Sequence, residues 1–190
     1  MVNIQKAAVV GCGFVGSAIA YALMQQGTFS ELVLLDANGA KAEGEAMDIS
    51  HGVPFAHAMD IRKGEYEDIA DAGVVIITAG ANQKPGESRL DLVQKNAGIM
   101  RSIIREIKRV NCEGILLIVS NPVDILTQVA LEESGFPKER VIGSGTVLDT
   151  ARLKYLVSGK LDVDSRNVHA FIIGEHGDSE LAVWSCANVY

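Results

Sequence analysis

The chain has 190 residues, 48% of them hydrophobic, which is enough for one sizeable core or for one domain and part of a second, and short for a complete two-domain enzyme. Its net charge is −7 and no segment carries a basic stripe, which argues against nucleic acid as a partner. Three cysteines, Cys12, Cys112 and Cys186, lie far apart without a C-x-x-C pair, so we expect a reducing compartment, no disulfide framework and no metal site.

The first apolar stretch, Ala7 to Ser30, has no charged residue and follows Lys6, so a signal peptide or membrane anchor is one interpretation. Three glycines instead divide it into a strand-sized piece, Ala7 to Val10, and a helix-sized piece, Val15 to Gly27. A single lysine also makes a weak charged region for a signal peptide. We therefore expect a cytoplasmic protein with no membrane segment.

Short apolar runs rich in valine and isoleucine recur along the chain, as strands buried on both faces do. They cover Ala7 to Val10, Leu32 to Leu35, Val74 to Ala79, Gly114 to Val119 and Val168 to Ile173. Longer segments with helical spacing lie between them, and in one of these Leu92, Ile99, Ile103 and Ile107 form an apolar face. Helices between parallel strands supply right-handed crossovers, so the pattern predicts an α/β fold with a Rossmann-type doubly wound sheet.

The clearest domain boundary lies at Gly143-Ser144-Gly145, after a predicted strand from Arg140 to Ile142 and before a new helix. It predicts a cofactor-binding domain over residues 1–143. Residues 144–190 would then begin a second, α+β substrate domain that this chain does not finish. We expect Asp178 to Tyr190 to start a helix within it.

A glycine-rich turn follows the first strand, where Gly11, Gly13 and Gly16 spell G-x-G-x-x-G and open a helix. Gly11 permits the tight turn, Gly13 lets a pyrophosphate approach the backbone, and Gly16 lets the helix pack on the strand. Asp36 stands 20 residues after Gly16, at the end of the next strand. A carboxylate there accepts ribose hydroxyls and repels a 2′-phosphate, so NAD is favoured over NADP. The alternative for Asp36 is an ordinary turn residue.

Four further motifs occur in order along the rest of the chain: Thr78 to Leu92, Ser120 to Asp124, Gly143 to Arg152 and Gly174 to Asp178. In residues, order and spacing they resemble the bacterial L-lactate dehydrogenases of the lactate/malate dehydrogenase family. That family continues well past this length, so the chain resembles a carboxy-terminally truncated member. The resemblance implies reversible hydride transfer between (S)-lactate and NAD, giving pyruvate and NADH, as in fermentative pyruvate reduction.

The resemblance also implies catalytic roles. His176 would exchange the hydroxyl proton as the acid/base, and Asp149 would hold its other ring nitrogen and stabilise the imidazolium. Arg152, three residues later on the same helical face, would bind the substrate carboxylate, and Arg89 would reach the carbonyl oxygen when its loop closes. Taken alone, His176 is a solvated or packed imidazole, the two arginines are ordinary surface residues, and Asp149 is an acid in the first turn of a helix.

The other substrate contacts that the resemblance implies are Gln83, Asn121 and Asp124. Asn121 follows a strand and would bridge the nicotinamide and the substrate oxygen. Gln83 would face the third-carbon group of the substrate, where malate dehydrogenases place an arginine for the second carboxylate. The neutral amide of Gln83 would leave that carboxylate unpaired in a closed site, so pyruvate and lactate are the favoured substrates. Larger 2-oxo acids stay open as further substrates.

The remaining expectations also follow from the resemblance. Further cofactor contacts would be Val15, Lys41, Tyr66, Gly80, Ala81, Ser102, Val119, Asn121 and Ser144. Many bacterial relatives bind fructose 1,6-bisphosphate at a subunit interface through an arginine and a histidine. His169 matches that histidine, but Lys154 stands at the arginine position without its bidentate fork, so activation by the sugar phosphate stays open. The family is usually tetrameric, which implies a homo-oligomer.

Three alternatives stand beside this hypothesis. A truncated chain could bind NAD as a folded module without turnover. A malate dehydrogenase, or another 2-hydroxy acid dehydrogenase, shares the motifs, although Gln83 opposes malate. A short-chain reductase or epimerase is opposed because Tyr21, Tyr66 and Tyr155 have no lysine four residues later.

Overall fold

The computed structural model describes residues 1–82, 86 and 88–190, with only the backbone of Arg89. Its helices are α1 (Phe14–Gln26), α2 (Gly39–Ser50), α3 (Arg89–Arg109), α4 (Val123–Ser134) and α5 (Val147–Leu161). Its strands are β1 (Asn3–Val10), β2 (Glu31–Leu35), β3 (Asp60–Lys63), β4 (Ala72–Ile77), β5 (Ile115–Ile118), β6 (Val141–Gly143), β7 (Val168–His169), β8 (Ile172–Ile173), β9 (Leu181–Ala182) and β10 (Asn188–Val189). Short 3₁₀ turns lie at Val53–Phe55, Tyr66–Ile69, Lys138–Arg140, Ser165–Asn167 and Trp184–Cys186.

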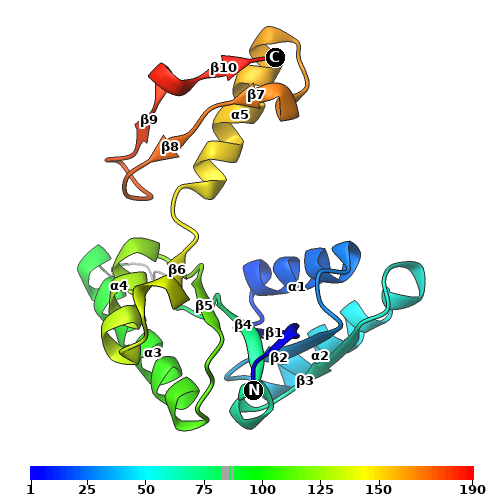
Figure 1. Ribbon diagram of the computed structural model, residues 1–190. Coiled ribbons are helices and arrows are strands. Elements are labelled where there is room, and N and C mark those ends of the chain that lie inside the picture. Colours follow the sequence, from blue (N-terminus) through cyan, green and yellow to red (C-terminus); the bar gives the residue numbers. More distant parts are fainter. Residues whose placement is uncertain (83–85, 87) are drawn as a thin grey trace.

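The first six strands form one parallel sheet in the order β3-β2-β1-β4-β5-β6. Figure 1 shows α1 and α2 on one side of this sheet and α3 and α4 on the other. The chain winds outward from β1 in one direction and then from β4 in the other, which is the doubly wound Rossmann arrangement. The predicted fold class is confirmed, with the beginning of a second, partial domain after β6.

Neighbouring residues of one strand enter two different cores. In β1, Ala8 and Val10 pack into the core that α3 and α4 cover, and Ala7 and Val9 pack into the core that α1 and α2 cover. Both sheet faces are therefore dry, and every position of a central strand needs an apolar side chain. This is why the strands appear in the sequence as continuous apolar runs.

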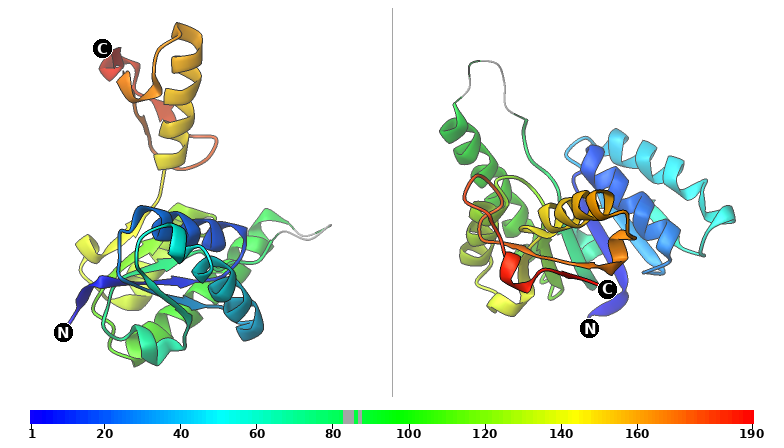
Figure 2. Two further views of the ribbon diagram at one scale, coloured as in Figure 1. Left: turned by 90° about the vertical axis from the view of Figure 1, so that its right-hand side faces the viewer. Right: turned by 90° about the horizontal axis from the view of Figure 1, so that it is seen from above.

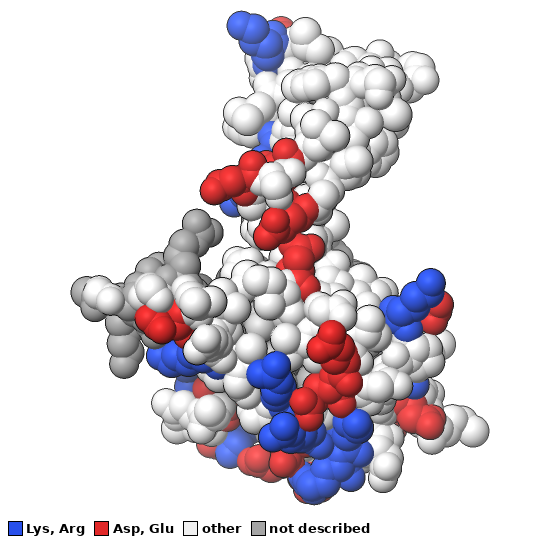
Figure 3. Space-filling view, turned by 90° about the vertical axis from the view of Figure 1, so that its left-hand side faces the viewer, with Lys and Arg blue, Asp and Glu red and all other residues white. Residues whose placement is uncertain are grey.

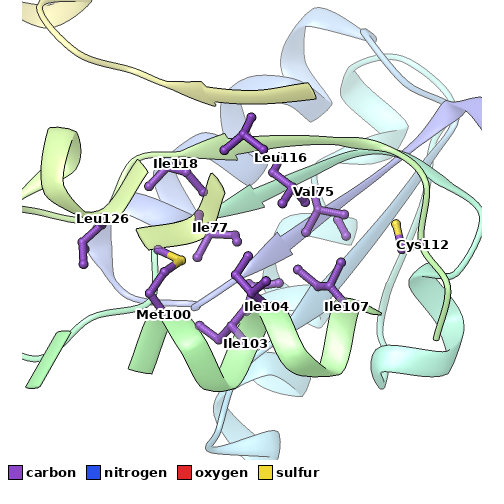
Figure 4. Close-up of a cluster of buried hydrophobic side chains, with 14 of the residues drawn as sticks. Val75, Ile77, Met100, Ile103, Ile104, Ile107, Cys112, Leu116, Ile118 and Leu126 are labelled. Carbon is purple, nitrogen blue, oxygen red and sulfur yellow. The ribbon is translucent and has the colours of Figure 1, made fainter. Parts of the chain in front are cut away.

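Helix α3 confirms the predicted amphipathic helix. It buries Met100, Ile104 and Ile107 against the sheet, where Figure 4 shows them facing side chains of β4 and β5. Its start is set by a capping box, in which the Ser88 side chain accepts the Asp91 backbone N–H and the Asp91 carboxylate accepts the Ser88 backbone N–H. The cap places the first turn of α3 immediately after the loop that follows β4.

The carboxyl ends of the central strands form the edge that matters for function. Val10 of β1 pairs with Leu35 of β2 and Ile77 of β4, and Ile77 pairs with Ile118 of β5. The loops that follow these four strands therefore lie side by side. The strand order reverses between β1 and β4, and ligands of open α/β sheets bind in the crevice at such a reversal.

The predictions for the end of the chain need correction. The expected strand from Val168 to Ile173 is divided into β7 and β8, and the expected helix from Asp178 to Tyr190 is wrong. There β9 pairs antiparallel with β8, and β10 pairs with β7. Leu181 and Val183, two residues apart, have strand spacing, and their backbone partners Ile173 and Phe171 lie eight and twelve residues earlier.

The sequence analysis also missed β3, the edge strand of the sheet. Only Ile61 of β3 is buried, so the strand has no apolar run to reveal it. Its Arg62 guanidinium lies 3.2 Å from the Glu31 carboxylate and 3.0 Å from that of Asp68. Charged side chains on an edge strand oppose pairing with another chain, and here they also join β3 to β2.

Helix α5 and the strands β7 to β10 form a lobe beside the sheet, joined to it by residues 144–146 (Figures 1 and 2). Figure 3 shows acidic side chains gathered where this lobe meets the sheet domain, and mixed charges over the lower part of that face.

The uncharged stretch from Ala7 to Ser30 is divided between β1 and α1. Among the described residues, none of the helices has the length and apolar character that crossing a membrane requires.

Candidate active site

The glycine turn after β1 is tightly packed on one side and open on the other. Gly11 has a φ of +104°, and a Cβ there would lie 2.6 Å from the Ala79 backbone nitrogen. A Cβ on Gly16 would lie 1.9 Å from the Gly11 carbonyl oxygen. A Cβ on Gly13 would meet nothing within 4 Å. The turn thus needs glycine at positions 11 and 16 for its own packing, and position 13 leaves the backbone open to a ligand.

Asp36 is held beside this turn by the backbone. Its Oδ2 accepts the Cys12 N–H at 2.7 Å, and its Oδ1 accepts the Asn38 N–H at 2.8 Å. The carboxylate is partly exposed, and each of its oxygens has a further lone pair to offer. Asp36 therefore presents an oriented acceptor at the carboxyl end of β2, where a ribose would lie in a dinucleotide fold.

His176 and Asp149 form a close pair in the second lobe. His176 Nδ1 lies 2.5 Å from Asp149 Oδ2, the aspartate is 6% exposed, and the imidazole side chain is 26% exposed. Burial by itself raises the pKa of Asp149, but the hydrogen bond from His176 and the charges of His176 and Arg152 lower the pKa below its ordinary value. The carboxylate thus stays ionised and can stabilise a protonated imidazole.

Arg152 completes this cluster on helix α5. Its Nη1 lies 3.0 Å from Asp149 Oδ1, so each carboxylate oxygen of Asp149 has one partner, the imidazole or the guanidinium. The Arg152 side chain is 62% exposed, which leaves donors free for an anion from solvent. Glu180 lies nearby, with ligand atoms of Asp149, His176 and Glu180 within 4.8 Å of one another. Sequence reasoning foresaw neither Glu180 nor this metal-competent grouping.

Asp124 joins the two lobes at the histidine. It lies in the first turn of α4, and its Oδ2 accepts the His176 backbone N–H at 2.9 Å. The sequence predicts Asp124 as a substrate contact, but here its carboxylate holds the backbone of the histidine. This hydrogen bond brings the loop around His176 to the carboxyl end of β5.

Asn96 of α3 holds two of the loops at this edge and was missed by the sequence analysis. Its Oδ1 accepts the Ala81 N–H at 2.8 Å, and its Nδ2 donates to the Asn121 carbonyl oxygen at 3.0 Å. A signal was present in the sequence, because Asn96 falls on the apolar face between Leu92 and Ile99 at helical spacing. A lone amide in an apolar stripe indicates a buried hydrogen-bonding role.

Several other predicted residues lie at the same edge through their backbone. Gly80 and Ala81 follow β4, Val119 donates its N–H to the Ile77 carbonyl at 2.9 Å, and Ser144 donates to the Ile118 carbonyl at 2.9 Å. Val15 and Lys41 lie exposed in the first turns of α1 and α2, next to the glycine turn and Asp36. Ser102 lies on the exposed face of α3, where its hydroxyl donates to the Ile99 carbonyl.

Tyr66 begins the short 3₁₀ turn that follows β3, and it is half-buried. It packs against the core under α3 and α4, where burial and the charge of Glu106 raise the pKa of its phenol to about 12. Its neighbour Glu67 pairs with Arg109, the last residue of α3, at 2.8 Å. The adenosine contact expected of Tyr66 stays a prediction.

Two predicted residues cannot be placed. Gln83 lies outside the described residues, and so does the side chain of Arg89, although its backbone begins α3.

The two residues predicted for an effector lie elsewhere, in the second lobe. Lys154 lines a cavity of about 200 Å³, and His169 on β7 makes an edge-to-face contact with the Tyr190 ring at 5.3 Å.

Comparison with known proteins agrees with this geometry. Residues 5–143 match the model of the lactate/malate dehydrogenase NAD binding domain, and residues 146–190 match that of the lactate/malate dehydrogenase alpha/beta C-terminal domain. The chain is 59% identical to an L-lactate dehydrogenase of Acetivibrio thermocellus, over 98% of this chain and 59% of that protein. It is 57% identical to an L-lactate dehydrogenase of Priestia megaterium, over 97% of this chain and 58% of that protein.

Solved structures give the same result. A lactate dehydrogenase from a Medee basin deep-sea metagenome superposes with a TM-score of 0.96 at 56% identity, over 99% of this chain and 60% of that one. The minor L-lactate dehydrogenase of Enterococcus mundtii in its ligands-bound form superposes with a TM-score of 0.96 at 51% identity, over 98% of this chain and 60% of that one. The chain spans about 60% of the length of these relatives. By its motifs, its fold and these matches over nearly all of its length, the chain belongs to the lactate/malate dehydrogenase family.

Proposed function

We propose that the protein to which this chain belongs is an L-lactate dehydrogenase, which transfers a hydride reversibly between (S)-lactate and NAD. The pair formed by His176 Nδ1 and Asp149 Oδ2 at 2.5 Å carries the proposal, since it joins a proton-transfer group to a dinucleotide fold. The names of the relatives support the same reaction. We also propose that residues 1–143 form the cofactor domain and that residues 144–190 begin the substrate domain.

The residues of the glycine turn fit NAD. The open backbone at Gly13 and the N-terminus of α1 would receive the pyrophosphate, and the oriented Asp36 carboxylate would accept the ribose hydroxyls. A 2′-phosphate would meet that carboxylate and be repelled, so we propose NAD rather than NADP. When bound, the reduced cofactor supplies the hydride.

The remaining steps belong to the protein. In pyruvate reduction, protonated His176 gives its proton to the carbonyl oxygen as the hydride arrives at the carbon, and lactate forms. Asp149 keeps the ring oriented and stabilises its charged form before the transfer. The exposed donors of Arg152 would bind the substrate carboxylate. Arg89 would stabilise the developing charge on the oxygen, and Gln83 would admit a methyl group.

Turnover of pyruvate against oxaloacetate tests the proposal. The assay protein is the completed chain, in which residues 1–190 are followed by the corresponding carboxy-terminal segment of the Acetivibrio thermocellus relative. NADH oxidation at saturating pyruvate should be fast, should be much slower with oxaloacetate, and should be lost on His176→Ala. A preference for oxaloacetate would indicate a malate dehydrogenase, and full activity of His176→Ala would refute the proposed acid/base.

For residues 1–190 alone we propose NADH binding without turnover. Helix α5 exposes large apolar side chains in this chain, with Tyr155 at 73%, Leu156 at 68% and Val147 at 72%. Exposed patches of this kind normally meet another surface. Binding of NADH to residues 1–190 should quench the fluorescence of the protein or shift that of NADH. Pyruvate should not oxidise the bound NADH. Pyruvate-dependent oxidation would show that the further carboxy-terminal segment of the relatives is dispensable for chemistry.

Replacement of Asp124 should disturb catalysis through His176. In the completed chain, Asp124→Ala removes the acceptor of the His176 N–H and should lower kcat about 10- to 100-fold. Asp124→Asn keeps an acceptor oxygen and should cost clearly less. Steady-state kinetics with pyruvate measures both variants. A higher KM with an unchanged kcat would instead support Asp124 as a direct substrate contact.

An effector, an oligomer and a compartment complete the proposal. Lys154 and Arg166 place two cations around the cavity of about 200 Å³, which suits a phosphate group. Fructose 1,6-bisphosphate should lower the KM of the completed chain for pyruvate, less so in Lys154→Ala and more so in Lys154→Arg. An identical KM with and without millimolar sugar phosphate would rule this effector out.

We further propose a homotetramer in the cytoplasm, where free thiols such as Cys12 and Cys112 remain reduced.

A further inference from the structure

Asn96 is a buried amide whose hydrogen bonds end in two different loops. The residue is 3% exposed. Its Oδ1 accepts the Ala81 N–H at 2.8 Å, while its Nδ2 donates to the Ala81 carbonyl at 3.3 Å and to the Asn121 carbonyl at 3.0 Å. Both amide protons and one acceptor site are thus in use. One side chain therefore joins the loop after β4 to the loop after β5.

The bonds involve the segments that carry the proposed chemistry. Ala81 follows β4 and is an expected cofactor contact, and Asn121 is the proposed contact to the substrate oxygen. Asn96 also lies seven residues after Arg89, nearly two full turns of α3, so both residues are on one side of the helix. The amide therefore fixes α3 to both loops close to the start of the helix.

The chemistry of this position requires an amide. A carboxylate would keep the volume and the acceptor for the Ala81 N–H, but it would face the carbonyl oxygens of Ala81 and Asn121 without a proton to donate. An apolar side chain would leave all three backbone groups unpaired in a dry site. A hydrogen bond with a purely structural role could have its partner anywhere in the core, whereas the partners of Asn96 lie in the two loops of the site.

We propose that Asn96 is a positioning residue of the dehydrogenase reaction, which holds the Asn121 and Ala81 loops in the register that the substrate and nicotinamide require. The inference rests on the proposed function. The Asn96 side chain binds the backbone carbonyl of Asn121. A change at Asn96 should therefore shift the Asn121 side chain without removing a contact between Asn96 and the substrate. Misplacement by a fraction of an ångström slows the reaction step more than it weakens binding.

Asn96→Asp in the completed chain tests this inference. We expect kcat with pyruvate to fall about 10- to 100-fold, with the KM for pyruvate changed less than about threefold. Burial raises the pKa of a carboxyl at this position, and the protonated acid can again donate to the Asn121 carbonyl. The kcat deficit against wild type should therefore shrink as the pH is lowered. A folded Asn96→Asp protein with kcat within about threefold of wild type at every pH would overturn the inference.

Two further variants separate positioning from stability. Asn96→Ser keeps one donor and one acceptor in a smaller side chain, and serves if the aspartate variant does not fold; its kcat should also fall, and wild-type kcat would overturn the inference. Ser134→Ala removes a buried hydroxyl of α4 that bonds the Leu131 carbonyl and the Phe136 N–H, away from the site. It should lower the Tm and leave kcat unchanged. An equal loss of kcat in Ser134→Ala would make the Asn96 effect a general loss of stability and overturn the inference.

The two proposals fail in different ways. A wild-type completed chain that binds NADH but does not reduce pyruvate would overturn the proposed function and this inference with it. An active wild type with an equally active Asn96→Asp variant would overturn the inference alone.

Discussion

Replacement of Asp149 by asparagine in the completed chain is expected to lower kcat for pyruvate reduction about 10⁴-fold. An amide at this position can donate to His176, which favours the wrong ring tautomer, and it carries no charge to stabilise the imidazolium. NADH binding should stay close to wild type, because the glycine turn and Asp36 do not contact the pair. Steady-state kinetics and a fluorescence titration with NADH measure the two effects separately.

The pH dependence of stability gives Asp149 a second readout. Burial raises the pKa of the carboxyl, but the bond to His176 and the charges of His176 and Arg152 outweigh it, so the folded pKa lies below the ordinary 3.8. A lowered folded pKa contributes stability above the unfolded pKa, and this is lost as pH falls through the folded value. Asp149→Asn should thus be less stable than wild type near neutral pH in urea denaturation, and the difference should shrink in acid.

Asp164→Asn is the matched control, since this exposed carboxylate of the same lobe pairs with Arg166 at 2.7 Å, away from His176. It should leave kcat unchanged. A kcat of Asp149→Asn within about tenfold of wild type would refute the assigned role of Asp149.

Gly16→Ala is expected to damage both the fold and cofactor binding. The new Cβ would lie 1.9 Å from the Gly11 carbonyl oxygen and 2.7 Å from Thr78 Oγ1, so α1 must move away from the turn. Overpacking of this kind costs about 1–3 kcal/mol of unfolding free energy or more. The displaced turn should also weaken NADH binding by a factor of about ten or more. Chemical denaturation and NADH titration of the completed chain measure the two losses.

Gly13→Ala separates the two effects. A Cβ there meets nothing within 4 Å, and the φ of −75° suits any residue, so the free energy of unfolding should stay close to wild type. The methyl group would occupy the space proposed for the pyrophosphate, and NADH binding should weaken. Normal NADH binding by Gly13→Ala would place the pyrophosphate elsewhere. Wild-type stability of Gly16→Ala would show that α1 can shift at little cost.

The central sheet and the cofactor turn could be predicted because their signals are local. Strands such as β4 (Ala72–Ile77) are buried on both faces, so their apolarity is continuous, and the amphipathic face of α3 repeats at helical spacing. The three glycines and Asp36 have fixed spacings that follow from backbone sterics. The edge strand β3 left no such signal, because one of its faces is solvated and its charged residues are paired with neighbours.

Elements that depend on distant partners were missed or wrong. The segment from Asp178 to Tyr190 forms strands because β7 and β8, whose paired residues lie 8 to 21 positions earlier, supply its hydrogen bonds. Propensity and motif are weak where tertiary pairing decides the outcome.

By itself, then, the sequence determined the fold class and the NAD fingerprint, since short-range sterics and residue chemistry are enough for these, and its resemblance to the family implied which groups would transfer the proton. Only the tertiary structure decided how those groups meet. The structure alone shows that the His176 ring contacts Asp149, that the His176 backbone N–H donates to Asp124, and that the Asn96 side chain binds both loops of the site. These contacts join residues 15 or more positions apart, and such pairs form only when the packed sheet and the second lobe bring distant segments together.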